Sequence, residues 1–189
     1  MNPCYAALDT LLIRYVNLFK DQPNELPSVD FESPWPSPCS ENTPDDPDNP
    51  QKKYWKPIER NELNLFADLE KALEVTFHPD IKTFYGSFWS NGICVEREDI
   101  NFSLIQIWNK DDEAHLKENL LGHAFAKIKA RLPLTFFIGC TYGDEIICLD
   151  QETGNIVLEK PGRLTHKTLA PSLEALLISL NPTTDSYEA

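Results

Sequence analysis

Residues 134–159 read LTFFIGCTYGDEIICLDQETGNIVLE and contain three short apolar runs separated by turn residues. The runs 134–142, 145–150 and 156–159 have the length of strands and are too short for most helices. The last two runs are joined around Thr153, Gly154 and Asn155, and a tight glycine-containing turn favours an antiparallel hairpin. The stretch therefore predicts neighbouring antiparallel strands.

Outside this stretch, apolar residues recur at helical spacing in four segments. The first predicts a helix over residues 4–20, and the second predicts a helix that follows the N-cap Asn61 and ends at 78–79. The third follows the N-cap Asn109, and the fourth begins after Pro171. The apolar residues expected to face the core are Leu8, Leu11, Leu12, Tyr15 and Phe19; Leu65, Leu69, Ala72, Leu73 and Thr76; Ala114, Leu121, Ala124, Phe125 and Ile128; and Leu173, Leu176, Leu177 and Leu180.

Two further strands are expected at residues 93–96 and 102–108, joined by an acidic turn, and residues 80–89 are expected to form a short helical turn. The order is then helix, long loop, helix, strands, helix, strands, helix, with hairpins between consecutive strands. This order favours an α/β (α+β) fold, in which helices pack on a mixed, antiparallel-rich sheet. It disfavours a doubly wound parallel sheet.

Residues 21–60 interrupt the periodic pattern with prolines and with an acidic stretch at 41–50. Proline removes a backbone donor and restricts the residue before it, so this segment is expected to be a loop. Trp35, Tyr54 and Trp55 are large rings whose burial would anchor the loop onto the body of the protein. We therefore expect the loop to wrap the domain.

The 189 residues, 41% of them hydrophobic, are enough for one buried core. We expect a single domain over residues 1–182 and a flexible tail at 183–189. Five cysteines without a CxxC pair make a poor disulfide framework and favour a reducing cytosol. The longest apolar run, 134–140, is far shorter than a membrane-spanning helix, and the N-terminus lacks a secretory signal.

Thirty Asp and Glu residues against seventeen Lys and Arg residues give the chain a net charge of −13. Nucleic acids and anionic lipid surfaces are bound by clustered basic residues, so both are disfavoured as direct partners. A basic protein segment is the complementary partner for an acidic surface. The alternative is that the acidic residues serve solubility alone.

The common motifs of nucleotide-binding and hydrolytic sites are absent: GxxxxGK[ST], GxGxxG, GxSxG and HExxH. His115 and His123 share a helix with Glu118, but at about 100° per residue their rings point roughly 80° apart, which is unsuited to one metal ion. His123 is expected to be a packed histidine near the sheet. An enzyme that uses Cys140 or a histidine would need an exposed thiol of lowered pKa beside an imidazole. We expect no catalytic residues, no metal, no cofactor and no small-molecule substrate.

Short motifs occur along the chain in a specific order. They are PSPC (36–39), YWKP (54–57), HPDIKTFY (78–85), LIQIW (104–108), ENLLGH (118–123), TFFI (135–138), TGNIV (153–157) and residues 169–180. The ordered set resembles the motif series of the Syd family of SecY-interacting proteins, over nearly all of residues 5–182.

The resemblance implies a fold similar to the SMI1/KNR4 group of binding domains, with an electronegative concave surface. It implies a non-enzymatic protein that binds basic cytoplasmic loops of SecY, the channel subunit of the translocase. Such a protein would associate peripherally with the cytoplasmic side of the cell inner membrane through SecY, and would monitor or negatively regulate improperly assembled translocase. The alternative is a binding or immunity-type module of the same fold directed at another basic protein.

The contact surface is predicted from acids at the two ends of the expected strand 102–108. A seven-residue strand spans about 23 Å, so its ends could flank one groove. Two aromatic residues would add anchoring. The predicted contact residues are Glu96, Glu98, Asp99, Asp111, Asp112 and Glu113, together with Trp108 and Tyr85.

Overall fold

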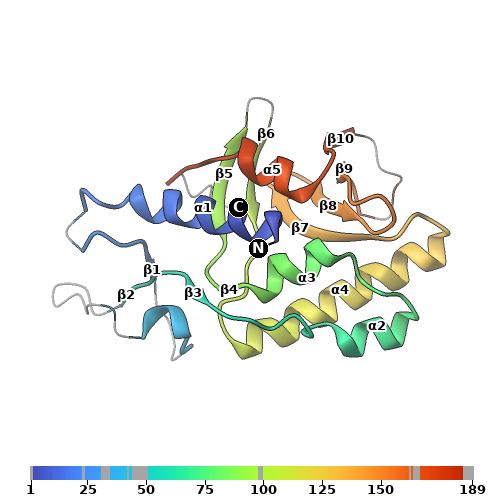
Figure 1. Ribbon diagram of the computed structural model, residues 1–189, viewed down its shortest axis with the longest axis horizontal. Coiled ribbons are helices and arrows are strands. Elements are labelled where there is room, and N and C mark those ends of the chain that lie inside the picture. Colours follow the sequence, from blue (N-terminus) through green and yellow to red (C-terminus); the bar gives the residue numbers. More distant parts are fainter. Residues whose placement is uncertain are drawn as a thin grey trace.

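The structure is a computed structural model that describes residues 2–22, 24–30, 35–41, 43, 51–97, 100–161, 163 and 167–184. Within these residues, seven strands form one antiparallel sheet in the order β10-β9-β8-β7-β6-β5-β11 (Figure 1). The strands are β5 (Ile93–Arg97), β6 (Ile100–Leu104), β7 (Thr135–Thr141), β8 (Ile146–Asp150), β9 (Ile156–Glu159), β10 (Lys167–Ala170) and β11 (Asn181–Pro182). The predicted α/β fold with an antiparallel-rich sheet is confirmed, including the hairpin of β8 and β9.

Strand β7 lies at the centre of the sheet and pairs with β6 and β8. A register shift between Phe137 and Gly139 marks a bulge in its pairing with β8. A Cβ at Gly139 would lie 2.6 Å from the carbonyl oxygen of Ser103, so only glycine allows β6 and β7 to approach this closely.

The predicted strand 102–108 is wrong at its C-terminal end, because β6 ends at Leu104. The Ile105 N–H still bonds to the Ile138 carbonyl, but the Ile107 carbonyl accepts from Ser90 N–H instead. The chain thus leaves the sheet and runs to the next helix. Strand β10, which no apolar run indicated, pairs with β9 through a bulge.

Five helices occur among the described residues: α1 (Pro3–Asn17), α2 (Ala67–Leu73), α3 (Pro79–Gly86), α4 (Lys110–Ala130) and α5 (Leu173–Ser179). Asn109 caps α4 as predicted, since its Oδ1 accepts from Asp112 N–H at 2.9 Å. The prediction for α2 is wrong at both ends, because the helix begins at Ala67 and already ends at Leu73. The N–H groups of Arg60 and Glu62 bond to the carbonyls of Ser87 and Gly86, so the chain around Asn61 is held beside the end of α3.

Figure 1 shows α1 and α5 side by side across the front of the sheet, with α3 below them and α4 and α2 along the lower edge. The core between these layers is rich in aromatic rings, and Phe77 and Phe136 lie with ring centroids 4.1 Å apart. None of the described helices has the length and apolar content needed to cross a bilayer.

Helix α4 presents a different face to the core from the one predicted. The buried residues are Leu116, Leu120, Ala124 and Lys127. Phe125 and Ile128, which were expected to be buried, are 52% and 50% exposed. The helix is rotated so that Lys127 reaches Glu159 on β9, and this remote partner was not visible in the local pattern.

The described parts of segment 21–60 pack on the body of the protein. They form β1 (Ser28–Asp30), which pairs with β2 (Lys52–Tyr54), a short 3-10 helix (Pro38–Ser40), and β3 (Ile58–Glu59), which pairs with β4 (Phe88–Trp89). The ring of Trp55 is buried between Tyr15 and Trp108. Trp35, in contrast, is 46% exposed, so the expectation that its burial anchors the loop is wrong.

Candidate protein-binding surface

The acids predicted at the β5–β6 turn begin with Glu96, an exposed residue on β5. Its position in the sheet is set by pairing with Asn101 on β6 and Asn181 on β11. Glu98 and Asp99 lie outside the described residues. Of the three acids predicted at this turn, the structure therefore describes Glu96 alone.

The three acids at the start of α4 have different surroundings. Asp111 is exposed. A carboxylate oxygen of Asp112 accepts from the backbone N–H of Trp108 at 2.8 Å. Glu113 accepts from Arg60 at 2.7 Å and from Lys110 at 3.1 Å, and its side chain is only 12% exposed. Asp112 and Glu113 therefore hold the start of α4 in place, and Asp111 is the acid most accessible to a partner.

The two groups of acids lie far apart in the arrangement of elements. In Figure 1 the β5–β6 hairpin ends at the top, whereas α4 begins near the bottom. The link between them is the five-residue strand β6 followed by residues 105–109, in place of the predicted seven-residue strand. That both groups face one groove stays a prediction.

The two predicted aromatic anchors occupy different environments. Trp108 is half-buried, and its Nε1–H donates to the carbonyl of Trp35 at 3.3 Å. Tyr85 is 0% exposed, and its hydroxyl donates to the Phe137 carbonyl at 2.9 Å. The prediction of Tyr85 as a contact residue is therefore wrong: its side chain belongs to the core.

A cationic and aromatic cluster that sequence reasoning missed lies beside the start of α4. The guanidinium of Arg60 stacks 3.8 Å from the ring centroid of Trp89, and the ammonium of Lys110 lies 5.4 Å from the same centroid. Trp89 and Lys110 line a pocket of about 280 Å³ together with Asp111. No local motif marks Arg60, because its side-chain partners Trp89 and Glu113 come from two other elements, β4 and α4.

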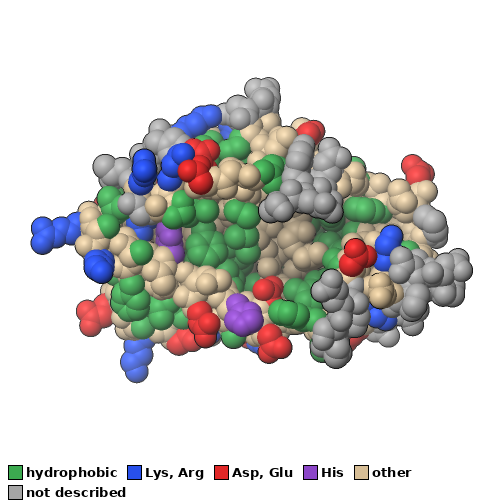
Figure 2. All heavy atoms as spheres, turned by 180° about the vertical axis from the view of Figure 1, so that it is seen from behind, with side chains coloured by type: hydrophobic (Ala, Val, Ile, Leu, Met, Phe, Trp, Pro, Cys, Tyr) green, Lys and Arg blue, Asp and Glu red, His purple; other side chains and the backbone are tan. Residues whose placement is uncertain are grey.

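The outer face of the sheet is the one turned away from α1 and α5. One row of paired residues crosses it from β5 to β9: Cys94, Ser103, Cys140, Ile146 and Glu159. Figure 2 shows this face, whose recessed middle is lined by hydrophobic side chains and uncharged atoms, while the Asp and Glu side chains seen there lie mainly toward the edges.

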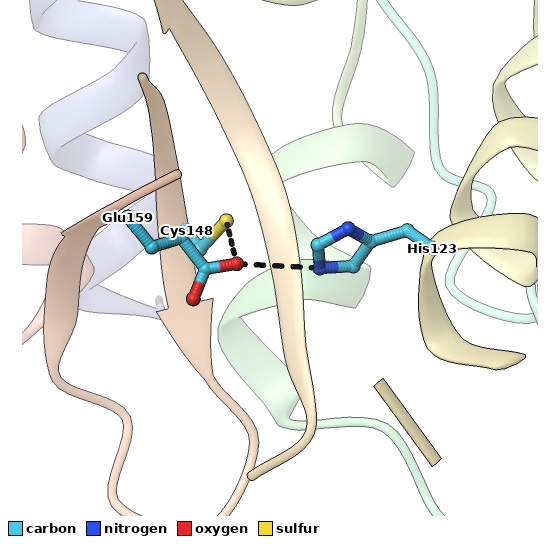
Figure 3. Close-up of side chains that lie close together, drawn as sticks. All are labelled: His123, Cys148 and Glu159. Carbon is cyan, nitrogen blue, oxygen red and sulfur yellow. Dashed lines mark hydrogen bonds and ion pairs between the residues drawn. The ribbon is translucent and has the colours of Figure 1, made fainter. Parts of the chain in front are cut away.

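A buried polar network joins α4 to this outer face (Figure 3). Glu159 accepts from Lys127 Nζ at 2.6 Å, from Thr135 Oγ1 at 3.0 Å and from Cys148 Sγ at 3.4 Å. Because Thr135 donates its only hydrogen to Glu159, the bond of 3.1 Å between His123 Nε2 and Thr135 requires His123 to donate. The expected role of His123 as a packed histidine beside the sheet is confirmed.

The protonation states in this network follow from burial. Burial lowers the pKa of His123, against the opposing effect of nearby Glu159, so the ring is neutral near pH 7. Burial and the negative charge of Glu159 raise the pKa of Cys148 well above its usual value. The network therefore consists of one ion pair, Lys127 with Glu159, surrounded by neutral hydrogen-bonding groups.

His123 Nε2, Cys148 Sγ and a Glu159 oxygen lie within 4.8 Å of one another, close enough to be considered as metal ligands. A metal ion requires a deprotonated ring nitrogen and a thiolate. Here Nε2 bears the proton, the thiol pKa is raised, and the Lys127 ammonium already neutralises Glu159. The arrangement favours a structural role.

Cys140 is exposed, as the enzymatic alternative requires. However, partial burial of the thiol and the neighbouring Cys94 raise the pKa of Cys140 instead of lowering it. A protonated thiol is a weak nucleophile, so the condition set for a catalytic Cys140 is not met.

These features define a mixed α/β domain with an acidic composition and with buried polar groups that stabilise the fold. The sequence profile of the family described as Syd protein (SUKH-2) matches residues 5–182. The chain belongs to the Syd family.

Related proteins of this family are found in several bacteria. Protein Syd of Hahella chejuensis is 49% identical over 134 residues, which cover 71% of this chain and 70% of the relative. Protein Syd of Pseudoalteromonas atlantica is 33% identical over 179 residues, covering 94% and 95%. Protein Syd of Shewanella loihica is 34% identical over 180 residues, covering 93% and 81%. The matched family is not named for a catalytic activity.

Proposed function

We propose that this protein binds basic cytoplasmic segments of SecY, the channel subunit of the protein translocase. Membership of the Syd family together with the net charge of −13 is the observation that supports this function. Cytoplasmic loops of membrane proteins are enriched in Lys and Arg, so they complement an acidic surface. Through SecY the protein is held peripherally at the cytoplasmic side of the inner membrane, where it monitors or restrains improperly assembled channels.

The contact surface that we propose consists of Glu96, Glu98, Asp99 and Asp111. Glu96 and Asp111 are exposed, and their charges are therefore available to a partner. Asp112 and Glu113 are left out, because replacing either would disturb the start of α4 as well as the surface. Trp108 lies next to Asp112 and adds a half-buried ring.

The chain acts as one domain in this proposal, with residues 1–182 forming the Syd domain and segment 21–60 wrapped around it. Two described contacts support the wrapping: Ser37 Oγ donates to the Trp108 carbonyl at 2.6 Å, and Asn109 Nδ2 donates to the Pro36 carbonyl at 3.1 Å. At the other end, Thr183 N–H donates to Cys94 O, so the chain is still paired at the first residue of the expected tail. Residues 185–189 lie outside the described residues.

The test is to replace the four contact acids by Lys and to measure capture of the purified protein by detergent-solubilised SecY complex. We expect the affinity to fall by about tenfold or more, because like charges then face each other. The matched control reverses four exposed acids elsewhere, Asp21, Glu62, Glu74 and Glu152, and should retain binding. Equal loss in both variants would mean that only net charge matters, and no loss in either would reject the proposed surface.

Salt provides an independent measurement on the unmodified protein. Exposed charge pairs are screened within about 10 Å at 0.1 M ionic strength, so capture should weaken as salt rises. Capture that is unchanged in concentrated salt would exclude a charge-based contact. Recovery of a different basic protein, with no SecY, after purification from cells would reassign the partner.

A further inference from the structure

Helix α4 has an apolar stripe that the described part of the chain covers only at Leu121, which packs against the edge of the core. Leu121, Phe125 and Ile128 follow one another at spacings of four and three, so they lie on one side of the helix. Leu121 is half-buried, while Phe125 and Ile128 are about half exposed. Such spacing is typical of a helix face that packs against another element, yet α4 packs on the sheet through an adjacent side, which buries Leu116, Leu120, Ala124 and Lys127.

Gly122 lies on the exposed side of α4, next to this stripe. No atom of the described part of the chain lies within 4 Å of the position that its Cβ would occupy. Glycine inside a helix destabilises it by comparison with alanine, and no contact with the described residues requires glycine here. A small residue at this point allows the backbone of a second helix to approach closely.

Two opposite charges border the stripe on the same flank. Glu118 and Lys129 are exposed, and neither forms an ion pair with another described residue. They are eleven residues apart, which places them within about 20° of each other around the helix axis. The midpoint of Glu118 and Lys129 nearly coincides with the midpoint of Leu121 and Ile128, close to residue 124.

This placement is complementary to itself. If a second α4 packs antiparallel about a twofold axis near residue 124, Glu118 lies opposite the partner's Lys129, and Leu121 lies opposite the partner's Ile128. The two Phe125 rings then meet close to the axis. An isologous contact of this kind satisfies both charges and covers the apolar stripe at once.

We propose that the stripe Leu121, Phe125 and Ile128, flanked by Glu118 and Lys129, is the surface through which two copies of this chain associate with antiparallel α4 helices. An anionic lipid surface fits the stripe less well, because Glu118 borders it and the whole chain bears a charge of −13. One helix pair buries less area than a standard interface, so the dimer is weak.

The experiment is sedimentation velocity over protein concentrations from about 10 µM to about 500 µM, a range suited to weak association. The unmodified protein should shift from monomer toward dimer as concentration rises. Phe125→Glu should raise the dimer dissociation constant by about tenfold or more, because it places two carboxylates at the axis. Because Phe125 is half exposed, the urea midpoint of this variant should stay unchanged.

A charge swap tests the antiparallel arrangement. Glu118→Lys and Lys129→Glu should each weaken association by roughly threefold to tenfold, since each creates two like-charge contacts. The double variant Glu118→Lys/Lys129→Glu should restore it, because every opposite pair is re-formed with the signs exchanged. Glu152→Lys, at an exposed residue in the turn between β8 and β9, controls for net charge and should have no effect on association.

A monomer at every concentration, or a double variant weaker than both single variants, would overturn the proposal. Loss of SecY capture or of binding to anionic vesicles by Phe125→Glu, with unchanged sedimentation, would assign the stripe to that partner instead. Because the stripe contains none of the four proposed SecY-contact acids, the two proposals can fail separately.

Discussion

The two ends of helix α4 are each tied to the body of the protein by a buried ion pair, but the pairs differ in their surroundings. At the N-terminal end, Arg60 and Glu113 have side chains 5% and 12% exposed, and two guanidinium nitrogens of Arg60 find no hydrogen-bond partner among the described residues. At the C-terminal end, Lys127 and Glu159 are 2% and 0% exposed.

The difference lies in how each charge is compensated. Glu159 also accepts from Thr135 and Cys148, so both of its oxygens are engaged. Besides Glu113, the Arg60 guanidinium contacts the face of the Trp89 ring. The ring attracts the cation, but it does not replace the missing hydrogen-bond acceptors. Removing one member of the Lys127–Glu159 pair should therefore destabilise the fold more than removing one member of the Arg60–Glu113 pair.

The largest effect is expected from Lys127→Met. The variant leaves Glu159 buried without its counter-charge, which costs about 3–5 kcal/mol of unfolding free energy. Urea denaturation followed by circular dichroism measures this loss. Adding Glu159→Gln should recover most of it, because no buried charge then remains.

The matched control is Lys117→Met on the same helix. Lys117 pairs with Asp68 at 2.9 Å, but Asp68 is largely exposed, so the loss should be about 0–1 kcal/mol. Equal losses for Lys117→Met and Lys127→Met would show that burial of the C-terminal pair has no special weight.

A smaller effect is expected from Glu113→Gln. The amide oxygen can still accept from Arg60, but the charge-assisted bond is lost, which costs roughly 1.5–3 kcal/mol. Denaturation under the same conditions compares this variant with Lys127→Met. A loss larger than that of Lys127→Met would reverse the proposed order of the two pairs.

The smallest effect concerns His123 and pH. Burial lowers the pKa of His123 from 6.5, so the unfolded chain takes up a proton at a higher pH than the folded chain does. The stabilisation from this neutral histidine is fully present above pH 6.5 and is lost as the pH falls through the lower folded pKa. Between about pH 7.5 and about pH 5.5, unmodified protein should lose more stability than His123→Gln. Equal losses of stability in the two proteins over this pH range would contradict a lowered pKa of His123 in the folded state.

Several parts of the fold were readable from short-range patterns. The runs 134–142, 145–150 and 156–159 became β7, β8 and β9, and Asn109 caps α4 with its own side chain. Helix α1 buries Leu8, Leu11 and Leu12 as predicted, although it ends at Asn17, before Phe19. These features depend on residues within a few positions of one another, where spacing and capping chemistry are sufficient.

The candidate site was predicted less completely. Glu96 and Asp111 are exposed as expected, whereas Tyr85 lies in the core and Glu113 is paired with Arg60. In the sequence, an aromatic or acidic residue looks the same whether its side chain is buried or exposed. Only the packing of α3 under the sheet and the approach of Arg60 from another segment distinguish the two.

The sequence by itself determined the antiparallel strands β7, β8 and β9, the Asn109 cap and the excess of negative charge, because these follow from local spacing and from composition. The tertiary structure alone decided which side of α4 faces the sheet. That choice depends on Lys127 meeting Glu159, 32 residues away, and periodicity shows which residues share a face without showing which face finds a partner.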